Sequence, residues 1–156
     1  MQGLNWFIAN FSQEKVVFSP GEIQMKHGAF IENCSDSAVI IEDKFKSLQM
    51  NKSKNVTLVV FNCVSGVDIM NCENVKIYIK GMVPSIAVDK CQKVRIILNE
   101  KNLGVDIVSS KVTELQIAYE KMDGNESKDH PVSEQLITKW NPASKKFETH
   151  IYDKFL

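Results

Sequence analysis

The fold is decided by residues 63–81, CVSGVDIMNCENVKIYIKG, because the sequence on either side repeats the same pattern. Steps of nineteen residues from Cys72 reach only small residues, at Cys34, Ser53, Cys72, Cys91 and Ser110. Three residues earlier the side chain is always apolar, at Ile31, Met50, Ile69, Val88 and Ile107. Apolar residues also stand five and seven residues after each small position in every copy. A fixed period over five copies indicates a repeat architecture.

The repeating unit has the periodicity of a strand. Within one copy the apolar residues alternate, as at Val75, Ile77 and Ile79, and a period of two is typical of strands. Short repeated strands without Asn-Gly hairpin turns stack in parallel as successive coils. At about 3.3 Å per residue, one copy makes a circuit of roughly 60 Å. We therefore predict an all-β fold: a right-handed parallel β-helix of about six coils with a C-terminal β-hairpin.

The small positions are expected to lie at an inward-facing corner between two strands. A redox or metal role for a cysteine ladder is the alternative, but serine replaces cysteine in two of the five copies. The four cysteines also show no CxxC pair and no metal-ligand spacing. Since buried free cysteine behaves as a small apolar residue, we interpret this column as packing and the thiols as free.

Composition limits the function classes. A chain of 156 residues suffices for one domain with a core. Nineteen basic and nineteen acidic residues cancel, which argues against broad binding of nucleic acid or anionic membrane. No apolar run reaches the length of a membrane span, and the first residues lack the features of a signal peptide. We expect a cytoplasmic protein.

The repeat also divides the single domain, residues 1–156, into three parts. Residues 1–26 are expected to form an N-terminal cap coil, residues 27–119 the regular coils, and residues 120–156 a loop followed by a hairpin. The end of the chain alternates like a strand far from the last copy. Such a segment often caps the open edge of a second copy. This segment, which alternates at Phe147, Thr149 and Ile151, is therefore expected to form a domain-swapped dimer.

One outward-facing column is apolar. Six residues after each small position stand Ile40, Val59, Tyr78, Ile97 and Gln116. Charged residues, including Lys76 and Arg95, flank this stripe. An apolar stripe with a charged border is typical of a protein-binding surface. The alternative is that a terminal segment of the same chain covers part of it.

The sequence gives no sign of a catalytic centre. The three histidines fall in unrelated places, and no phosphate-binding loop or catalytic triad is present. Asp68 and Asp106 stand in one column of the nineteen-residue alignment, as acidic residues do in calcium-binding β-helical polysaccharide lyases, but Ala87 interrupts them. We expect no enzyme activity, no cofactor and no metal site.

Several segments resemble one protein family. GAFIENCSDSAVIIEDK, SGVDIMNCENVKIYIKGMVPSIAVDKC, GVDIVSSKVTELQI and HPVSEQLITKWN are similar, in this order, to the C-terminal domain of the cyclase-associated proteins. The resemblance covers essentially the whole chain. It implies a right-handed β-helix that dimerises by swapping its C-terminal hairpin, through Phe147, Thr149, Ile151 and Tyr152. The implied partner is monomeric actin, preferably ADP-bound, with effects on monomer sequestration or nucleotide exchange.

The resemblance does not extend to the rest of that family's proteins. The N-terminal helical domain and the proline-rich linker have no counterpart here, so cyclase regulation and SH3 binding are not carried over. This leaves a naturally short form or a piece of a longer chain, and the initial Met favours the former.

The expected actin contacts lie on the outward strand face and at the end of the last copies. They are Thr57, Val59, Lys76, Tyr78, Arg95, Ile97, Ser110, Lys111 and Glu114.

Two other function classes stay open. Tubulin-binding cofactor C resembles this fold and stimulates GTP hydrolysis with an arginine, for which Arg95 is the one candidate. Its expected place in mid-strand is unfavourable for reaching a nucleotide. A polysaccharide-acting β-helix is the other class, and it needs a groove longer than five or six coils provide.

Overall fold

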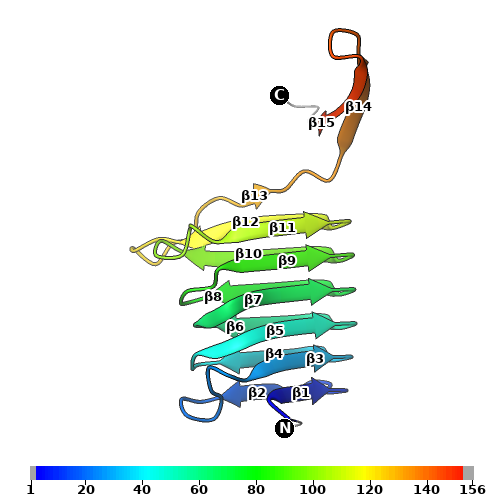
Figure 1. Cartoon of the computed structure of the whole chain (residues 1–156). Helices are drawn as coiled ribbons and strands as arrows, with labels where there is room; N and C mark the ends of the chain where they lie inside the picture. Colours follow the sequence, from blue (N-terminus) through cyan, green and yellow to red (C-terminus); the bar gives the residue numbers. More distant parts are fainter. Residues whose placement is uncertain (1–2, 153–156) are drawn as a thin grey trace.

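The structure, a computed structural model, describes residues 3–152 as strands and turns without a helix (Figure 1). The strands are β1 (Asn5–Ala9), β2 (Lys15–Phe18), β3 (Gly28–Glu32), β4 (Ser35–Ile41), β5 (Phe45–Asn51), β6 (Lys54–Val60), β7 (Cys63–Met70), β8 (Glu73–Ile79), β9 (Ser85–Asp89), β10 (Gln92–Asn99), β11 (Asp106–Ser110), β12 (Thr113–Glu120), β13 (His130–Pro131), β14 (Leu136–Asn141) and β15 (Lys146–Ile151). Residues 1–2 of the expected cap coil and 153–156 of the expected C-terminal segment lie outside the described residues.

The strands wind into a flattened β-helix of two facing sheets. The odd sheet has the order β1-β3-β5-β7-β9-β11, and the even sheet has the order β13-β12-β10-β8-β6-β4-β2. Each coil gives one strand to each sheet, from β1 and β2 in the first coil to β11 and β12 in the sixth. All pairs between coils are parallel; only β13 joins the even sheet antiparallel. The predicted parallel β-helix with a C-terminal hairpin is confirmed.

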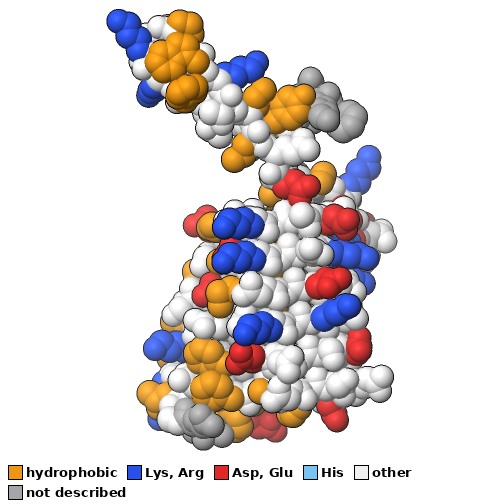
Figure 2. Space-filling view, turned by 90° about the vertical axis from the view of Figure 1, so that its right-hand side faces the viewer, with side chains coloured by type: hydrophobic (Ala, Val, Ile, Leu, Met, Phe, Trp, Pro, Cys, Tyr) orange, Lys and Arg blue, Asp and Glu red, His pale blue; other side chains and the backbone are white. Residues whose placement is uncertain are grey.

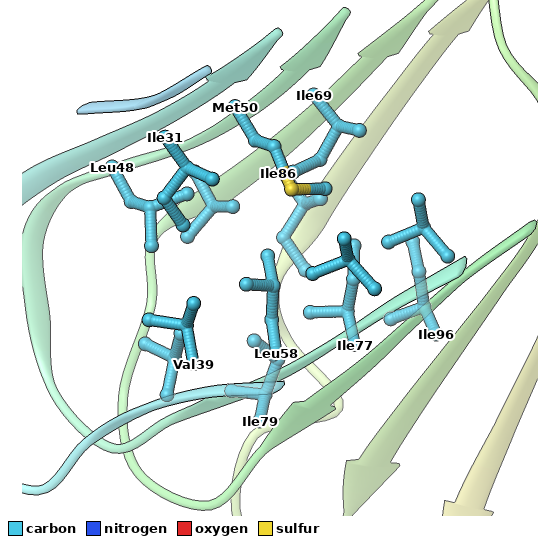
Figure 3. Packing of buried hydrophobic residues seen from close by; sticks show 14 of the residues in the cluster. Ile31, Val39, Leu48, Met50, Leu58, Ile69, Ile77, Ile79, Ile86 and Ile96 are labelled. Carbon is cyan, nitrogen blue, oxygen red and sulfur yellow. The ribbon is translucent and has the colours of Figure 1, made fainter. Parts of the chain in front are cut away.

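The core fills the space between the two sheets (Figure 3). Ile31, Leu48, Met50, Ile69 and Ile86 project from the odd sheet toward Val39, Leu58, Ile77, Ile79 and Ile96 of the even sheet, and all are at most 1% exposed. Each such side chain contributes about 1.5–3 kcal/mol when fully buried. Because each layer packs on the layers above and below, every coil depends on its neighbours.

A tight corner joins each odd strand to the even strand of the same coil. Two residues of every coil adopt the left-handed conformation there, with φ between 50° and 62°. They are Asn10, Asn33, Lys52, Asn71, Lys90 and Lys111 in the first column and Gln13, Asp36, Asn55, Asn74, Lys93 and Glu114 in the second. This conformation costs other L-residues about 1–2 kcal/mol, while Asn and Asp adopt it more readily. We name these two columns the left-handed corner.

Asparagine side chains also connect the coils along this corner. The amide of Asn74 donates to the side-chain oxygen of Asn55 at 2.8 Å, and Asn55 donates to Asp36 at 2.8 Å. In the first column Asn33 donates to Asn10 at 2.7 Å. These bonds lie parallel to the stack and add to the backbone ladder.

Of the small residues predicted for the corner, Cys34, Ser53, Cys72 and Cys91 lie between its two columns and point inward. The thiols of Cys72 and Cys91 contact the carbonyl oxygens of Met70 and Asp89 at 3.1 and 3.2 Å, and the hydroxyl of Ser53 donates to Asn51 at 3.1 Å. The neighbouring Cys91 thiol and burial raise the pKa of the Cys72 thiol. All four cysteines are buried and free. Cysteine and serine therefore have the same structural role here.

The nineteen-residue spacing is wrong for the last coil. Ile86 pairs with Ile107 and Val94 with Leu115, so the spacing there is 21 residues. The small position is consequently taken by buried Val112, and Ser110 is exposed. The two extra residues lie in the turn before β11.

A buried asparagine anchors this longer turn. The Asn102 amide donates to the carbonyl oxygens of Ile79 and Gly81 at 3.0 and 2.9 Å, and its oxygen accepts from the Asn99 N–H at 2.8 Å. Asn102 is only 2% exposed. These bonds satisfy a buried polar side chain and join the inserted turn to the coil below it. The insertion is therefore an integral part of the stack.

Substitution of Cys72 tests the packing interpretation. In Cys72→Ser the hydroxyl reaches the Met70 carbonyl as Ser53 reaches its own, so we expect the free energy of unfolding to change by about 1 kcal/mol or less. Cys72→Leu overpacks the corner and should cost about 1–3 kcal/mol. Urea unfolding of both variants gives the comparison. A serine variant as unstable as the leucine variant would contradict the shared role.

Candidate protein-binding surfaces

The outward face of the even sheet carries the apolar stripe predicted from the sequence. The strand registers place Val17, Ile40, Val59, Tyr78, Ile97 and Ala118 in one column across β2, β4, β6, β8, β10 and β12. Ile40, Val59 and Tyr78 are half-buried, and Val17 is exposed. We name this surface the even-sheet face.

Polar and charged residues flank the stripe. Thr57, Lys76 and Arg95 follow one another in the column on one side, as the registers of β6, β8 and β10 require. On the other side, the ammonium group of Lys80 lies 5.5 Å from the centre of the Tyr78 ring and 3.1 Å from Glu120. This cation–π contact places the ammonium group over the face of the Tyr78 ring. The face thus combines aliphatic, aromatic and basic groups on rigid strands.

The upper part of this face is covered, which corrects one predicted contact. Ile97 is 1% exposed and Ala118 is 2% exposed, although both point away from the core. The chain after β12 folds back here: β13 pairs with β12, and Arg95 binds Glu126 at 2.6 Å and Asp129 at 2.9 Å. Ile97 therefore cannot contact a partner as expected. At this end of the stripe the alternative interpretation holds, because a later segment of the same chain covers it.

The Arg95 side chain binds the covering segment and is therefore not free to bind another protein. Its guanidinium donates to Glu126 and through two nitrogens to Asp129. These hydrogen bonds, with Glu126 first, raise the pKa of Arg95. The two carboxylates neutralise the guanidinium and accept from three of its five N–H groups. A role for Arg95 in contacting another protein requires this segment to open.

The remaining predicted contacts do not share the even-sheet face. Because of the longer last coil, Gln116 and not Glu114 lies opposite Arg95. Lys111 and Glu114 occupy the two left-handed positions of the corner, and Ser110 ends β11 on the odd sheet. Thr57, Val59, Lys76 and Tyr78 thus remain together and accessible, whereas the other five predicted residues are covered, engaged or elsewhere.

The acidic column proposed for the odd sheet is also wrong. Asp68 lies opposite Ala87, whose next neighbour is Val108, while Asp106 lies opposite Ser85. The same two-residue shift separates the two carboxylates into different columns. Within residues 3–152, no group of three or more His, Cys, Asp or Glu side chains could hold a metal ion. No helix in that range is long and apolar enough to cross a membrane.

The C-terminal hairpin presents a second apolar surface. β14 and β15 pair with each other and extend beyond the last coil (Figure 1). Phe147, Thr149 and Ile151 lie on one face, where Phe147 and Ile151 are 71% and 68% exposed. Their cross-strand neighbours Trp140 and Leu136 are also exposed and complete this face. Sequence analysis missed these last two residues, although the alternation of residues 136–140 could have indicated them.

The comparisons with known proteins agree with this architecture. The protein-family model described as "Adenylate cyclase associated (CAP) C terminal" matches residues 1–154. This chain belongs to that family. It is also similar to the crystal structure of cyclase-associated protein from Cryptosporidium parvum, with 25% identity and a TM-score of 0.90. The match covers 97% of this chain and 93% of that chain. No match was found among the curated proteins.

Arg95→Ala tests whether the ion pairs hold the covering segment. We expect faster hydrogen–deuterium exchange in residues 121–131 and little change in the strands of the central coils. Because the pairs are partly exposed, the free energy of unfolding should fall by only about 1 kcal/mol. Lys54→Ala, which removes an exposed ion pair with Glu73 (3.9 Å), is the matched control. Unchanged hydrogen–deuterium exchange in residues 121–131 of Arg95→Ala would show that these ion pairs do not hold the covering segment.

Proposed function

We propose that this chain binds monomeric actin, preferably in the ADP-bound state, and regulates actin turnover by monomer sequestration or nucleotide exchange. The observation that carries this proposal is the family match over residues 1–154, because actin is the partner that the family resemblance implies. The expected site of action is the cytoplasm, in association with the cytoskeleton. The expected activity makes and breaks no covalent bond.

The accessible part of the even-sheet face is the best candidate for the actin contact. Val59 and Tyr78 provide apolar and aromatic area, and Thr57 and Lys76 provide polar contacts at its border. Aromatic anchors beside a polar border are typical of protein interfaces. Since the strands are fixed by the ladders on both sides, this surface is preorganised, and little ordering cost opposes binding.

Binding alone can produce either effect on actin. If the chain prefers the actin conformation that holds nucleotide loosely, its binding shifts actin toward that conformation and accelerates exchange. If it prefers the conformation that holds ADP tightly, it sequesters ADP-actin and slows release. The two outcomes differ only in which actin state is bound more tightly.

We further propose that the chain acts as a dimer that exchanges the C-terminal hairpin. A two-stranded hairpin is only marginally stable alone in water, and this one exposes an apolar face formed by Trp140, Phe147, Ile151 and Leu136. Packing against a second copy would bury that face. Phe147, Thr149, Ile151 and Tyr152 are the residues we propose for this interface.

GTPase activation by Arg95 is the less favoured function. An arginine that stabilises phosphoryl transfer must reach the nucleotide with a free guanidinium. Here that group is bound to Glu126 and Asp129 on a strand. The pairing favours the actin proposal over this alternative.

Nucleotide release from ADP-actin tests the proposed function. We expect the wild-type chain to change the release rate of a fluorescent ADP analogue: faster release means exchange, and slower release means sequestration. Tyr78→Ala and Lys76→Glu should each weaken actin binding about tenfold or more, since anchor residues contribute at least about 1.4 kcal/mol. Lys101→Glu, at the opposite corner, is the matched charge control. A wild-type chain that neither binds actin nor alters release would overturn the proposal.

Light scattering coupled to size exclusion tests the dimer. Phe147→Ser with Ile151→Ser should convert a dimer to a monomer, because two exposed apolar anchors are lost. Deletion of residues 145–156 should give the same result or unfold the chain. Lys139→Ser on the opposite face of the hairpin is the control and should stay dimeric. Circular dichroism shows whether the β-helix is intact; an intact double variant that remains dimeric excludes the proposed interface.

A further inference from the structure

The left-handed corner carries lysine where the backbone favours asparagine. Of its twelve positions, five hold asparagine and four hold lysine: Lys52, Lys90, Lys93 and Lys111. The asparagines show what the backbone prefers, because their short side chains tolerate this conformation and bond to one another along the stack. Lysine gains neither advantage. Strained residues that the fold does not require point to a role at the surface.

The lysines of the first column, Lys52, Lys90 and Lys111, repel one another, whereas Lys93 of the second column lies opposite Glu114. Lys90 and Lys111 occupy adjacent coils in the same column, and Lys52 lies two coils from Lys90. Neighbouring coils are about 4.8 Å apart, a distance at which like charges destabilise a sheet. All four side chains are exposed, and none forms an ion pair with any residue in the range 3–152. The first column of the corner is thus a row of positive charge on a chain with no net charge.

Lys52 and Lys90 border a shallow hollow. Between Lys52 and Lys90 the column holds Asn71, whose shorter side chain leaves a depression of about 430 Å³. Lys54 and Gln92 also line it. Figure 2 faces this corner and shows basic side chains above one another along the stack.

Acidic residues of the chain do not close the hollow. Glu73 also lines it but is directed to Lys54 at 3.9 Å. Asp36, the acidic residue of an earlier coil, accepts the Asn55 amide. Ammonium groups therefore dominate the depression and leave room for carboxylates from another molecule.

We propose that the left-handed corner docks an acidic surface of the protein partner, with carboxylates seated between Lys52 and Lys90. This inference rests on the proposed function, since the partner probed is actin. A row of flexible ammonium groups attracts carboxylates without demanding one fixed geometry. Such a row accelerates encounter, and its effect weakens with salt. Lys76 of the even-sheet face lies close by, so one partner can contact both surfaces: Asn74, Lys76 and Lys93 line a common hollow.

The test uses a substitution that relieves backbone strain at these positions and removes their positive charge at the same time. In Lys52→Asn with Lys90→Asn, both positions receive the residue that suits the backbone, so the urea midpoint should stay the same or rise. Association with ADP-actin at low salt, measured by stopped-flow fluorescence, should slow about three- to tenfold. The difference from wild type should shrink at about 0.3 M salt, where charges are screened within a few ångströms.

A matched control separates position from net charge. Lys44→Asn with Lys101→Asn removes the same charge from the opposite corner, where neither residue is left-handed, and should bind actin at the wild-type rate. The proposed docking surface would be overturned if both double variants associated equally slowly with actin, or if both associated at the wild-type rate. A fall in the urea midpoint of the first variant would overturn the strain argument. If wild type itself fails to bind actin, the proposed function fails, and the docking surface for actin fails with it.

Discussion

The parallel pairing between successive coils is the constraint on which the rest of the structure depends. One coil has two short strands and a single layer of apolar residues, which cannot form a core alone. Stacking brings residues such as Leu48, Leu58 and Ile77 into contact with the layers above and below. The same register then aligns every outward side chain in columns. A surface on the stacked coils is therefore made of such columns, and one shift in register moves a whole set of residues.

The register explains which parts of the fold could be predicted from the sequence. Apolar alternation and a constant period identify strands and parallel stacking, and both are visible in five copies. The period alone could not reveal the longer last coil, because a two-residue insertion preserves the alternation: Ile107 remains apolar and inward in either alignment. The shift is revealed by the anchoring bonds of Asn102, which depend on tertiary contacts.

In the candidate site, too, features set by the local sequence could be predicted, and features set by distant contacts could not. Val59 and Tyr78 could be placed on the outward face from alternation alone. The burial of Ile97 could not, because its cover comes from a segment without periodicity, held by Arg95 through carboxylates more than thirty residues away in the sequence. Long-range ion pairs leave no spacing signal. The left-handed corner lies between these cases, since the asparagines around the small positions are visible in the sequence, while their backbone conformation is not.

Stability and surface chemistry favour different residues at the left-handed corner but not in the core. Inside the coil, cysteine and serine are exchangeable because both fit the same small space and reach the same kind of carbonyl oxygen. At the corner, asparagine and lysine are not equivalent: asparagine satisfies the backbone, and lysine adds charge at a cost in conformation. A β-helix can bear such costs locally, because the ladders of the flanking strands hold each corner in place. Repetition thus supplies a rigid frame, and the departures from repetition at the corner, the covering segment and the hairpin create the surfaces that can distinguish one partner from another.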